Sequence, residues 1–283
     1  MKVGMNLLLW TTDINEQLNP ILHQLKETGF DGVEVPIGDE DVNEYKSLGK
    51  KIAELNMGCT CVSSVFEDGN PASPDKRIRE KAVDQMKWRI DMAKELGATN
   101  ICGPFHSAFA YFSGEPPTEI ERKHSIEVMR QAAEYAEQMD IVLTPEALNR
   151  FECYLYNTLD DISELVKSVD HPNMKMIFDT HHAHIEEKNS AASLKKFAEL
   201  IGHVHISESD RGTPGSGQVH WDSIFKTLSE INYDGWLTIE AFSRNKAEFA
   251  SNINVWRNFQ ESIDEIYKDG YSFIRNKLSQ YSI

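Results

Sequence analysis

The chain has 283 residues, of which 40% are hydrophobic and 26% are charged, a composition typical of a folded globular protein. Lys and Arg together number 29 against 45 for Asp and Glu, and the formal net charge is −16. This charge repels nucleic-acid backbones, so we expect no nucleic-acid partner, and no apolar run is long enough to cross a membrane.

Eight short apolar runs alternate with amphipathic stretches along the chain, which is the pattern of strands alternating with helices. In chain order, the runs that we expect to be strands are Val3–Trp10, Gly32–Pro36, Met57–Val65, Asn100–Phe105, Ile141–Leu148, Met174–Thr180, Gly202–Ser207 and Trp236–Phe242. The stretches with the clearest helical spacing of apolar residues are 18–30, 75–98, 118–139, 221–231 and 248–267.

This alternation predicts a parallel sheet covered by helices, and eight units in 283 residues match a (β/α)8 TIM barrel. A doubly wound open sheet is the alternative, but no GxGxxG follows the first run, as a dinucleotide-binding fold of that kind requires. No Ser-, Gly- or Pro-rich linker divides the chain. We therefore predict one α/β domain over residues 1–283, with a C-terminal helical extension over about residues 247–283.

Polar residues lie at the ends of four consecutive runs, at the edge of a barrel where active sites form. Glu146 lies near the end of the fifth run, Asp179 near the end of the sixth, His205 in the seventh and Glu240 in the eighth. His203 shares a strand face with His205, and we expect it one layer deeper. Three carboxylates at one rim repel one another unless a cation lies between them. An oxygen-rich set with one imidazole predicts a site for Mn²⁺, Mg²⁺ or Co²⁺, and Zn²⁺ is an open alternative.

Other polar residues have less specific patterns. His181 and His182 point to different sides of the chain, so at most one of them faces the pocket. His106, in the loop after the fourth run, either contacts a substrate or packs in the interior. The glutamates that follow the sixth and seventh runs are expected to be solvated charges: Glu186, Glu187 and Glu208. The cysteines form no CxxC pair and are expected to be buried free thiols in a reducing cytoplasm: Cys59, Cys61, Cys102 and Cys153.

Seven segments along most of the chain carry a family resemblance: "VGMN…W", "GFDGVEV", "GPFHSAFAYFSG", "ALNRFE", "FDTHHAHIEE", "HVHISESDRGTPGSGQVHW" and "DGWLTIEAF". The chain resembles the ketose 3-epimerases, typified by D-tagatose 3-epimerase and D-psicose 3-epimerase, in the xylose-isomerase-like TIM-barrel superfamily. The resemblance implies a metal site, with Mn²⁺ the favoured ion, formed by Glu146, Asp179, His205 and Glu240. It also implies catalysis by Glu146 and Glu240, and contacts to the sugar hydroxyls from Glu152, His182 and Arg211. Relatives commonly assemble, so the expected partners are a small sugar and further copies of the chain, as a homodimer or homotetramer.

The reaction that the resemblance implies is inversion at C3 of a free ketose, such as D-tagatose, D-psicose, D-fructose or L-ribulose. One carboxylate removes the proton α to the carbonyl, a cation stabilises the enediolate, and the other carboxylate returns a proton to the opposite face. Alternatives with the same metal site are an aldose–ketose isomerase, a hydroxypyruvate isomerase and an inosose dehydratase. The net charge of −16 disfavours a metal-dependent endonuclease, and the Glu146/Glu240 pair disfavours a sugar-binding protein without activity.

Four residues depart from the family pattern: Pro145, Ala147, Asn6 and His181. Ala147 follows the first candidate ligand, where the family often has proline. Pro145 precedes the first candidate ligand and cannot donate to a sheet, so we expect irregular strand pairing there. Asn6 and His181 stand where the family often carries aromatic residues, and this difference bears on which sugar the site accepts.

Overall fold

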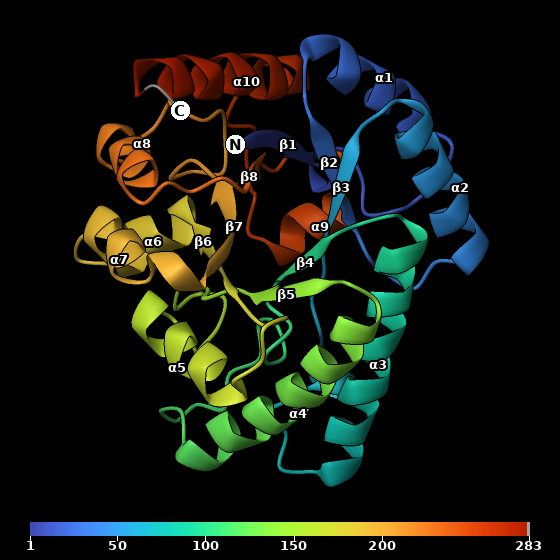
Figure 1. Ribbon diagram of the computed structural model, residues 1–283, viewed down its shortest axis with the longest axis vertical. Coiled ribbons are helices and arrows are strands. Elements are labelled where there is room, and N and C mark those ends of the chain that lie inside the picture. The colour runs from blue at the N-terminus through green and yellow to red at the C-terminus, as the bar shows by residue number, and fades with distance from the viewer. Residues whose placement is uncertain (282–283) are drawn as a thin grey trace.

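The computed structural model of the protein describes residues 1–281 and contains eight parallel strands. They lie in the order β5-β4-β3-β2-β1-β8-β7-β6, and a bridge between Leu143 and Met174 joins the two ends of the sheet. The sheet thus forms a nearly closed barrel surrounded by helices (Figure 1), which confirms the predicted (β/α)8 TIM barrel. The strands are β1 (Lys2–Asn6), β2 (Gly32–Pro36), β3 (Gly58–Val62), β4 (Asn100–Gly103), β5 (Val142–Pro145), β6 (Met176–Asp179), β7 (Ile201–Ile206) and β8 (Trp236–Ile239).

The helices follow the strands in sequence, and most of them cover the outside of the barrel, whereas α9 (Ala247–Asn252) lies over its opening (Figure 1). The α-helices are α1 (Leu18–Thr28), α2 (Val42–Glu54), α3 (Lys76–Glu95), α4 (Glu119–Gln138), α5 (Leu159–Val169), α6 (Thr180–Glu186), α7 (Ser190–Lys196), α8 (Trp221–Glu230), α9 (Ala247–Asn252) and α10 (Ile263–Gln280). Three short 3₁₀ helices are η1 (Leu7–Leu9), η2 (Glu67–Gly69) and η3 (Ala198–Leu200).

Local signals set the ends of these helices. At the start of α4, Thr118 Oγ1 accepts from the Glu121 N–H while the Glu121 side chain accepts from the Thr118 N–H. This reciprocal capping box satisfies backbone donors that a helix leaves free. At the end of α1, Gly29 has a φ of 111°, the left-handed conformation that commonly terminates a helix.

The strand that leads to Glu146 is paired unequally on its two sides. β5 pairs with β4 from Val142 to Pro145, so Pro145 itself continues the regular register on that side. On its other side β5 has only a single bridge, between Leu143 and Met174, just before β6. Glu146 comes directly after the last β5 residue, where the backbone leaves the sheet.

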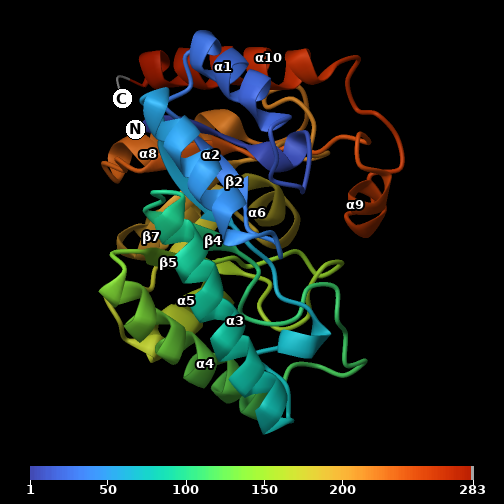
Figure 2. The ribbon, with the colours of Figure 1, turned by 90° about the vertical axis from the view of Figure 1, so that its right-hand side faces the viewer.

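Two predicted elements are wrong in part. Residues 248–267 form two helices, α9 and α10, instead of one, and Figure 2 shows α9 lying apart from α10. The apolar residues that suggested a continuous helix pack locally instead, with Phe249 and Val255 in a cluster around Phe242. The predicted strand Val3–Trp10 ends at Asn6, because the Asn6 side chain accepts from the Leu8 N–H and begins η1.

The predicted C-terminal extension belongs largely to the barrel itself. α10 packs on α1, α8, β1 and β8, and it buries Ile266, Tyr267, Ile274 and Leu278. The last two residues of the predicted extension, 282–283, lie outside the described residues. α10 therefore closes the ring of outer helices between α8 and α1 (Figure 1).

The cysteines and the apolarity of the helices bear on the class of protein. Cys59, Cys61, Cys102 and Cys153 are all buried free thiols, as predicted. Within residues 1–281, no helix combines the length and the apolarity that a membrane crossing needs.

Candidate active site

Four polar side chains meet at the carboxyl-terminal edge of the barrel, and they are the four predicted from the strand ends. Glu146 follows β5, Asp179 ends β6, His205 lies in β7 and Glu240 follows β8. Asp179 and His205 are register partners on neighbouring strands. One carboxylate oxygen or imidazole nitrogen from each residue lies within 4.8 Å of the others, and all four side chains are buried.

The spacing of these atoms fits a divalent cation. His205 Nδ1 lies 3.5 Å from Glu240 Oε2 and 3.6 Å from Asp179 Oδ2. Its distance to Glu146 Oε1 is 4.0 Å. Among residues 1–281, His205 Nδ1 and Glu146 Oε1 are buried without a hydrogen-bond partner, which is costly unless a ligand satisfies them. Three carboxylates and one imidazole are donors that suit Mn²⁺, Mg²⁺ or Co²⁺, so the cluster can hold such an ion.

The carboxyl groups of the cluster differ in their affinity for protons. Burial raises the pKa of Glu146 well above its usual value, and the negative charges of Glu240 and Asp179 raise it further. Burial also raises the pKa of Asp179, but Arg211, His182 and His205 together outweigh this effect and leave that pKa well below its usual value. The cluster thus combines an ionised Asp179 with a Glu146 that tends to retain its proton, and a cation in the cluster favours ionisation of Glu146.

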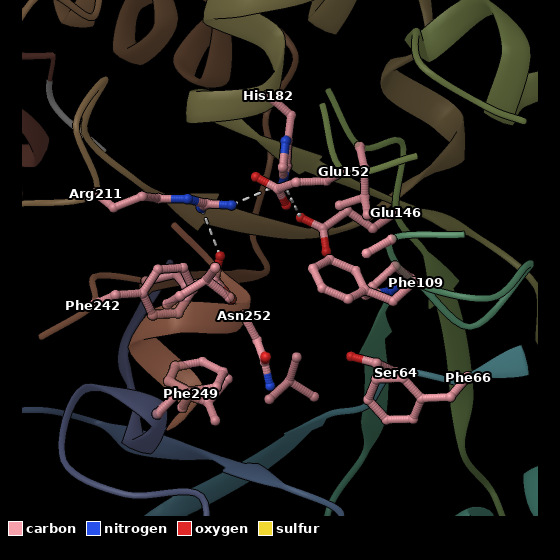
Figure 3. A pocket seen from close by; sticks show the side chains of 17 residues that line it. Ser64, Phe66, Phe109, Glu146, Glu152, His182, Arg211, Phe242, Phe249 and Asn252 are labelled. Carbon is pink, nitrogen blue, oxygen red and sulfur yellow. Dashed lines mark hydrogen bonds and ion pairs between the residues drawn. The ribbon is translucent and has the colours of Figure 1, made fainter. Parts of the chain in front are cut away.

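A cavity of about 300 Å³ adjoins this cluster. Its polar lining consists of Ser64, Glu146, Glu152, His182, Arg211, Glu240 and Asn252. Its apolar lining consists of Leu8, Val62, Phe66, Pro104, Phe109, Ala110, Leu148, Phe242, Phe249 and Ile253. Figure 3 shows Glu146, Glu152, His182 and Arg211 gathered on one side of the cavity, with aromatic rings on the other. The cavity therefore joins a charged wall to an apolar one.

Asn149 holds two of the predicted substrate contacts. Its side-chain Nδ2 donates to Glu152 Oε1 at 2.9 Å, and its backbone N–H donates to His182 Nδ1 at 3.0 Å. Burial lowers the pKa of His182 well below its usual value, and the nearby Arg211 charge lowers it further, so the ring is neutral. Because Nδ1 accepts a hydrogen bond, the single ring proton lies on Nε2, 3.6 Å from Glu146 Oε1. His182 can therefore donate to a ligand in the cavity.

Arg211 lies between the cluster and His182. Its Nη1 donates to Glu240 Oε2 at 2.7 Å and to Asp179 Oδ2 at 3.1 Å. Its Nη2 lies 2.9 Å from His182 Nε2. Both of these nitrogens carry hydrogens, so they cannot hydrogen-bond to each other. A ligand oxygen near them could accept a hydrogen bond from each. The guanidinium is thus placed to hold a polyhydroxylated ligand next to the carboxylates.

Glu208 is buried, which corrects its prediction as a solvated charge. Its carboxylate accepts hydrogen bonds from four N–H groups, those of Ser209, Gly215, Val219 and Trp221. Its backbone oxygen accepts from the Arg211 N–H at 3.0 Å. Glu208 therefore organises the loop that carries Arg211, and the glycines in this loop leave room for its carboxylate: a Cβ on Gly217 would lie 2.5 Å from Glu208 Oε1.

Glu186 and Glu187 are also held by neighbours, contrary to their prediction as solvated charges. Glu186 Oε2 pairs with Arg150 Nη2 at 2.7 Å. Glu187 Oε1 accepts from the Leu159 N–H at 2.7 Å, and its Oε2 accepts from Ser193 Oγ at 2.6 Å. These two carboxylates therefore tie the segment after β6 to the segment after β5.

His106 lies behind the site and supports it from there. It is fully buried, its Nε2 lies 2.8 Å from the backbone oxygen of Glu146, and its Nδ1 lies 2.9 Å from Ser107 Oγ. Burial lowers the pKa of His106 to about 4, so the ring is neutral and donates from Nε2. Pro104 and Phe109 form the cavity wall in this loop. The geometry therefore favours support of the Glu146 backbone over the predicted sugar contact.

The sequence patterns did not single out Glu34, which lies directly below the cluster. It occupies the centre of β2, where all five residues are buried, and His205 Nε2 lies 2.7 Å from its Oε1. His203 lies one layer below His205, as expected, with Nε2 2.9 Å from Glu34 Oε2. The available signal was a glutamate within the apolar strand "GVEVP", since a buried carboxylate requires partners.

His181 and His182 are adjacent in α6 and line neighbouring cavities that share Glu152 and Arg211. One ring nitrogen of each lies within 4.8 Å of a Glu152 carboxylate oxygen. His182 lines the cavity beside the cluster, whereas His181 lines a neighbouring cavity with Phe151 and Trp256. Burial lowers the pKa of His181 to about 3.

Comparison with known proteins identifies the family of the chain. The sequence model of the family described as "Xylose isomerase-like TIM barrel" matches residues 22–277. The D-psicose 3-epimerase of Ruminiclostridium cellulolyticum is 30% identical over 99% of this chain and 97% of its own length. The ketose 3-epimerase of Arthrobacter globiformis is 29% identical over 99% of this chain and 97% of its own.

Solved structures show the same relationship. The D-allulose 3-epimerase from Methylomonas sp. in complex with D-allulose has a TM-score of 0.91 and 27% identity, covering 98% of this chain and 97% of that one. A structure of L-ribulose 3-epimerase has a TM-score of 0.93 and 26% identity, covering 99% of this chain and 95% of that one. The chain therefore belongs to the xylose isomerase-like TIM barrel family and, within it, to the ketose 3-epimerases, which are carbohydrate isomerases.

Proposed function

We propose that this protein epimerises a free ketose at C3 with a bound divalent cation, of which Mn²⁺ is the first candidate and Mg²⁺ or Co²⁺ the alternatives. The observation that carries the proposal is that Glu146 and Glu240 line one cavity and also belong to one cluster of cation-binding donors. Inversion of a carbon centre requires a group that removes a proton and another that returns one. Two carboxylates in a single cavity meet this requirement.

The residues of the site would have separate roles in binding the cation and in transferring protons. Glu146, Asp179, His205 and Glu240 would hold the cation. When bound, the cation supplies positive charge that stabilises the negative charge developed on the sugar oxygens. Either Glu146 or Glu240 removes the C3 proton, and the other returns a proton to the opposite face.

The remaining polar lining would position the sugar. Arg211 and the Nε2–H of His182 donate to hydroxyl oxygens, and Glu152, held by Asn149, accepts from a hydroxyl group. D-psicose and L-ribulose, for which two of the relatives are named, are ketoses without a phosphate group. The apolar side of the cavity, with Phe109 and Phe249, suits the carbon skeleton of such a sugar.

The test is proton exchange in D₂O. Protein loaded with Mn²⁺ is incubated with D-fructose, D-psicose, D-tagatose or L-ribulose, and the metal-free products are recorded by ¹H NMR. We expect metal-dependent deuterium at C3 with both epimers present, and no exchange after chelation or in Glu146→Gln and Glu240→Gln. Deuterium at C1 would instead indicate an aldose–ketose isomerase, and exchange at no position in any of the four sugars would contradict the proposal.

We further propose a homodimer or homotetramer in the cytoplasm. The oligomeric state follows from the family resemblance. The cytoplasmic location follows from the four buried free thiols, since disulfides are rare in that compartment. Light scattering during gel filtration tests the assembly: a mass close to 32.2 kDa for the dominant species would contradict it.

A further inference from the structure

Below the candidate metal cluster, a chain of three hydrogen bonds runs through residues to which no role has been assigned. It begins at His205 Nε2, which lies 2.7 Å from Glu34 Oε1. Glu34 Oε1 accepts from Asn6 Nδ2 at 3.0 Å, and the same Nδ2 donates to Glu240 Oε1 at 3.1 Å. The chain therefore connects two of the four candidate ligands, His205 and Glu240, through the lower side of the site.

We propose that Glu34 and Asn6 act as a positioning clamp that fixes His205 and Glu240 for cation binding. The inference rests on the proposed function in one respect, that the four-residue cluster holds a divalent cation. It adds two positioning residues that neither touch the sugar nor contribute ligand atoms.

The effect on His205 follows from its two ring nitrogens. When a cation takes the place of the Nδ1 proton, the ring carries its one proton on Nε2, which donates to Glu34, and Nδ1 offers its lone pair. Nδ1 is the atom that lies 3.5 to 4.0 Å from Glu240, Asp179 and Glu146. Glu34 thus selects the tautomer that presents a lone pair to the cluster. A carboxylate that accepts from a metal-binding histidine in this way also orients the ring.

The effect on Glu240 follows from its two oxygens. Oε1 accepts from Asn6, whereas Oε2 receives Arg211 Nη1 at 2.7 Å and faces His205 Nδ1. Asn6 therefore holds one oxygen in place and leaves the other directed at the cluster.

The orientation of the Asn6 amide is determined by its surroundings. Its Oδ1 accepts from the Leu8 N–H at 2.9 Å, and its Nδ2 faces oxygens of Glu34 and Glu240. The reversed amide would place an oxygen against two carboxylate oxygens and an NH₂ group against a backbone N–H. That arrangement would place acceptor against acceptor and donor against donor. Only the observed amide orientation gives every group a hydrogen-bond partner.

The same region also has the composition of a second metal site, formed by Glu34, Cys102, His203 and His205. The distances argue against that interpretation. Glu34 oxygens lie 2.7 and 2.9 Å from imidazole nitrogens and 2.9 Å from Thr60 Oγ1, which are hydrogen-bond lengths. Donors that share a tetrahedral zinc ion at about 2.0–2.3 Å stand more than about 3 Å apart. Distances this short leave no room for a shared ion, and the contacts from His205 and Thr60 are hydrogen bonds.

The experiment measures Mn²⁺ affinity of the metal-free protein by competition with a fluorescent chelator, which requires no turnover. The variants are Asn6→Ala, Glu34→Leu and Glu34→Gln, and the matched control is Thr144→Val, a buried barrel residue that bonds to Asn100 instead of the clamp. Asn6→Ala and Glu34→Leu should weaken Mn²⁺ binding by about 10- to 100-fold, while Thr144→Val should change it less than about threefold. Glu34→Gln keeps an oxygen for His205 and Asn6, so it should recover most of the affinity.

A second readout separates positioning from general damage. Long-range ¹H–¹⁵N NMR of the Mg²⁺-loaded protein should show His205 protonated at Nε2 in the wild type and in Glu34→Gln, with that signature lost in Glu34→Leu. If Glu34→Leu does not fold, Asn6→Ala alone tests the clamp through Mn²⁺ affinity.

The outcomes separate the clamp from the proposed reaction. Epimerisation by the wild type together with unchanged Mn²⁺ affinity in Asn6→Ala and Glu34→Leu would overturn the clamp and leave the function standing. Weakened affinity without any epimerisation by the wild type would support the clamp and contradict the function. Two metal ions per chain in the wild type and one in Glu34→Leu would also overturn the clamp, because the network would then be a metal site.

Discussion

Glu146 Oε1 and His205 Nδ1 lie 4.0 Å apart in the barrel, both buried, and neither has a hydrogen-bond partner among residues 1–281. A cation between them satisfies both atoms, so the folded protein should bind the ion far better than the unfolded chain does. At an ion concentration about 100 times Kd, the expected stabilisation is about 2.7 kcal/mol. For a chain of this size, that corresponds to a rise in Tm of several degrees, roughly 5 °C.

Differential scanning fluorimetry with and without Mn²⁺ measures this shift. Glu146→Gln and His205→Asn should lose most of it, whereas Glu44→Gln, at an exposed position on α2, should keep it. A full Mn²⁺-dependent shift in His205→Asn would show that the ion binds elsewhere.

Arg211 should be required as an arginine and not merely as a positive charge. Its Nη1 donates to both Asp179 and Glu240, while its Nη2 lies beside His182 Nε2, where it can donate to a ligand oxygen. The single ammonium of lysine cannot reproduce this two-pronged arrangement. We expect Arg211→Lys to lower kcat/KM by about 100-fold, since charge-assisted hydrogen bonds are worth roughly 2–3 kcal/mol each. Steady-state kinetics on the fastest ketose measures the loss, with circular dichroism confirming that the variant is folded. If the Arg211→Lys enzyme were as efficient as the wild type, the two-pronged guanidinium contacts would not be required for activity.

Glu208 should stabilise the fold only above the pH at which it becomes protonated. Burial raises its pKa, but hydrogen bonds from Ser209, Trp221 and other N–H groups outweigh burial and lower that pKa below the usual 4.5. A carboxyl group whose pKa is lower in the folded state adds stability above its unfolded pKa and loses it as pH falls through the folded pKa. Glu208→Gln should therefore cost about 1–3 kcal/mol at pH 7 and progressively less from about pH 4.5 downward.

Urea denaturation of both proteins at several pH values, without added metal, measures this difference. A Glu208→Gln defect that stays constant down to pH 3 would show that its origin is not ionisation.

Gly103 should tolerate no side chain. Its φ is 119°, and a Cβ there would lie 2.4 Å from the backbone oxygen of Ser63, which cannot move without displacing β3. Gly97 is the matched control, because its φ of 72° is also left-handed but a Cβ there meets nothing within 4 Å. We expect Gly97→Ala to cost about 1 kcal/mol of unfolding free energy and Gly103→Ala at least about 2–3 kcal/mol.

The same substitution should also disturb the site, since the Glu146 N–H donates to the Gly103 oxygen at 3.1 Å. Mn²⁺ affinity should thus fall in Gly103→Ala and remain unchanged in Gly97→Ala. Equal effects of the two substitutions on stability would contradict the clash with Ser63.

The candidate ligands followed from the sequence because parallel strands of a barrel all end at one edge. A polar residue at the end of an apolar run is a local feature, and Glu146, Asp179, His205 and Glu240 each have it. The same reasoning failed for residues 248–267, where apolar side chains that suggested one helix pack around Phe242 instead.

Only the tertiary structure determined which partner each polar group meets. Asn6 and Glu240 are 234 residues apart in the chain and meet across the closed barrel, a contact that no local spacing encodes. Glu208 looks in sequence like a solvated glutamate, and Glu34 shows only that a carboxylate lies within an apolar strand. The N–H and O–H donors that make the burial of both possible are brought together by folding. Periodicity reports which face of an element a residue occupies, whereas the closure of the barrel determines what that residue meets.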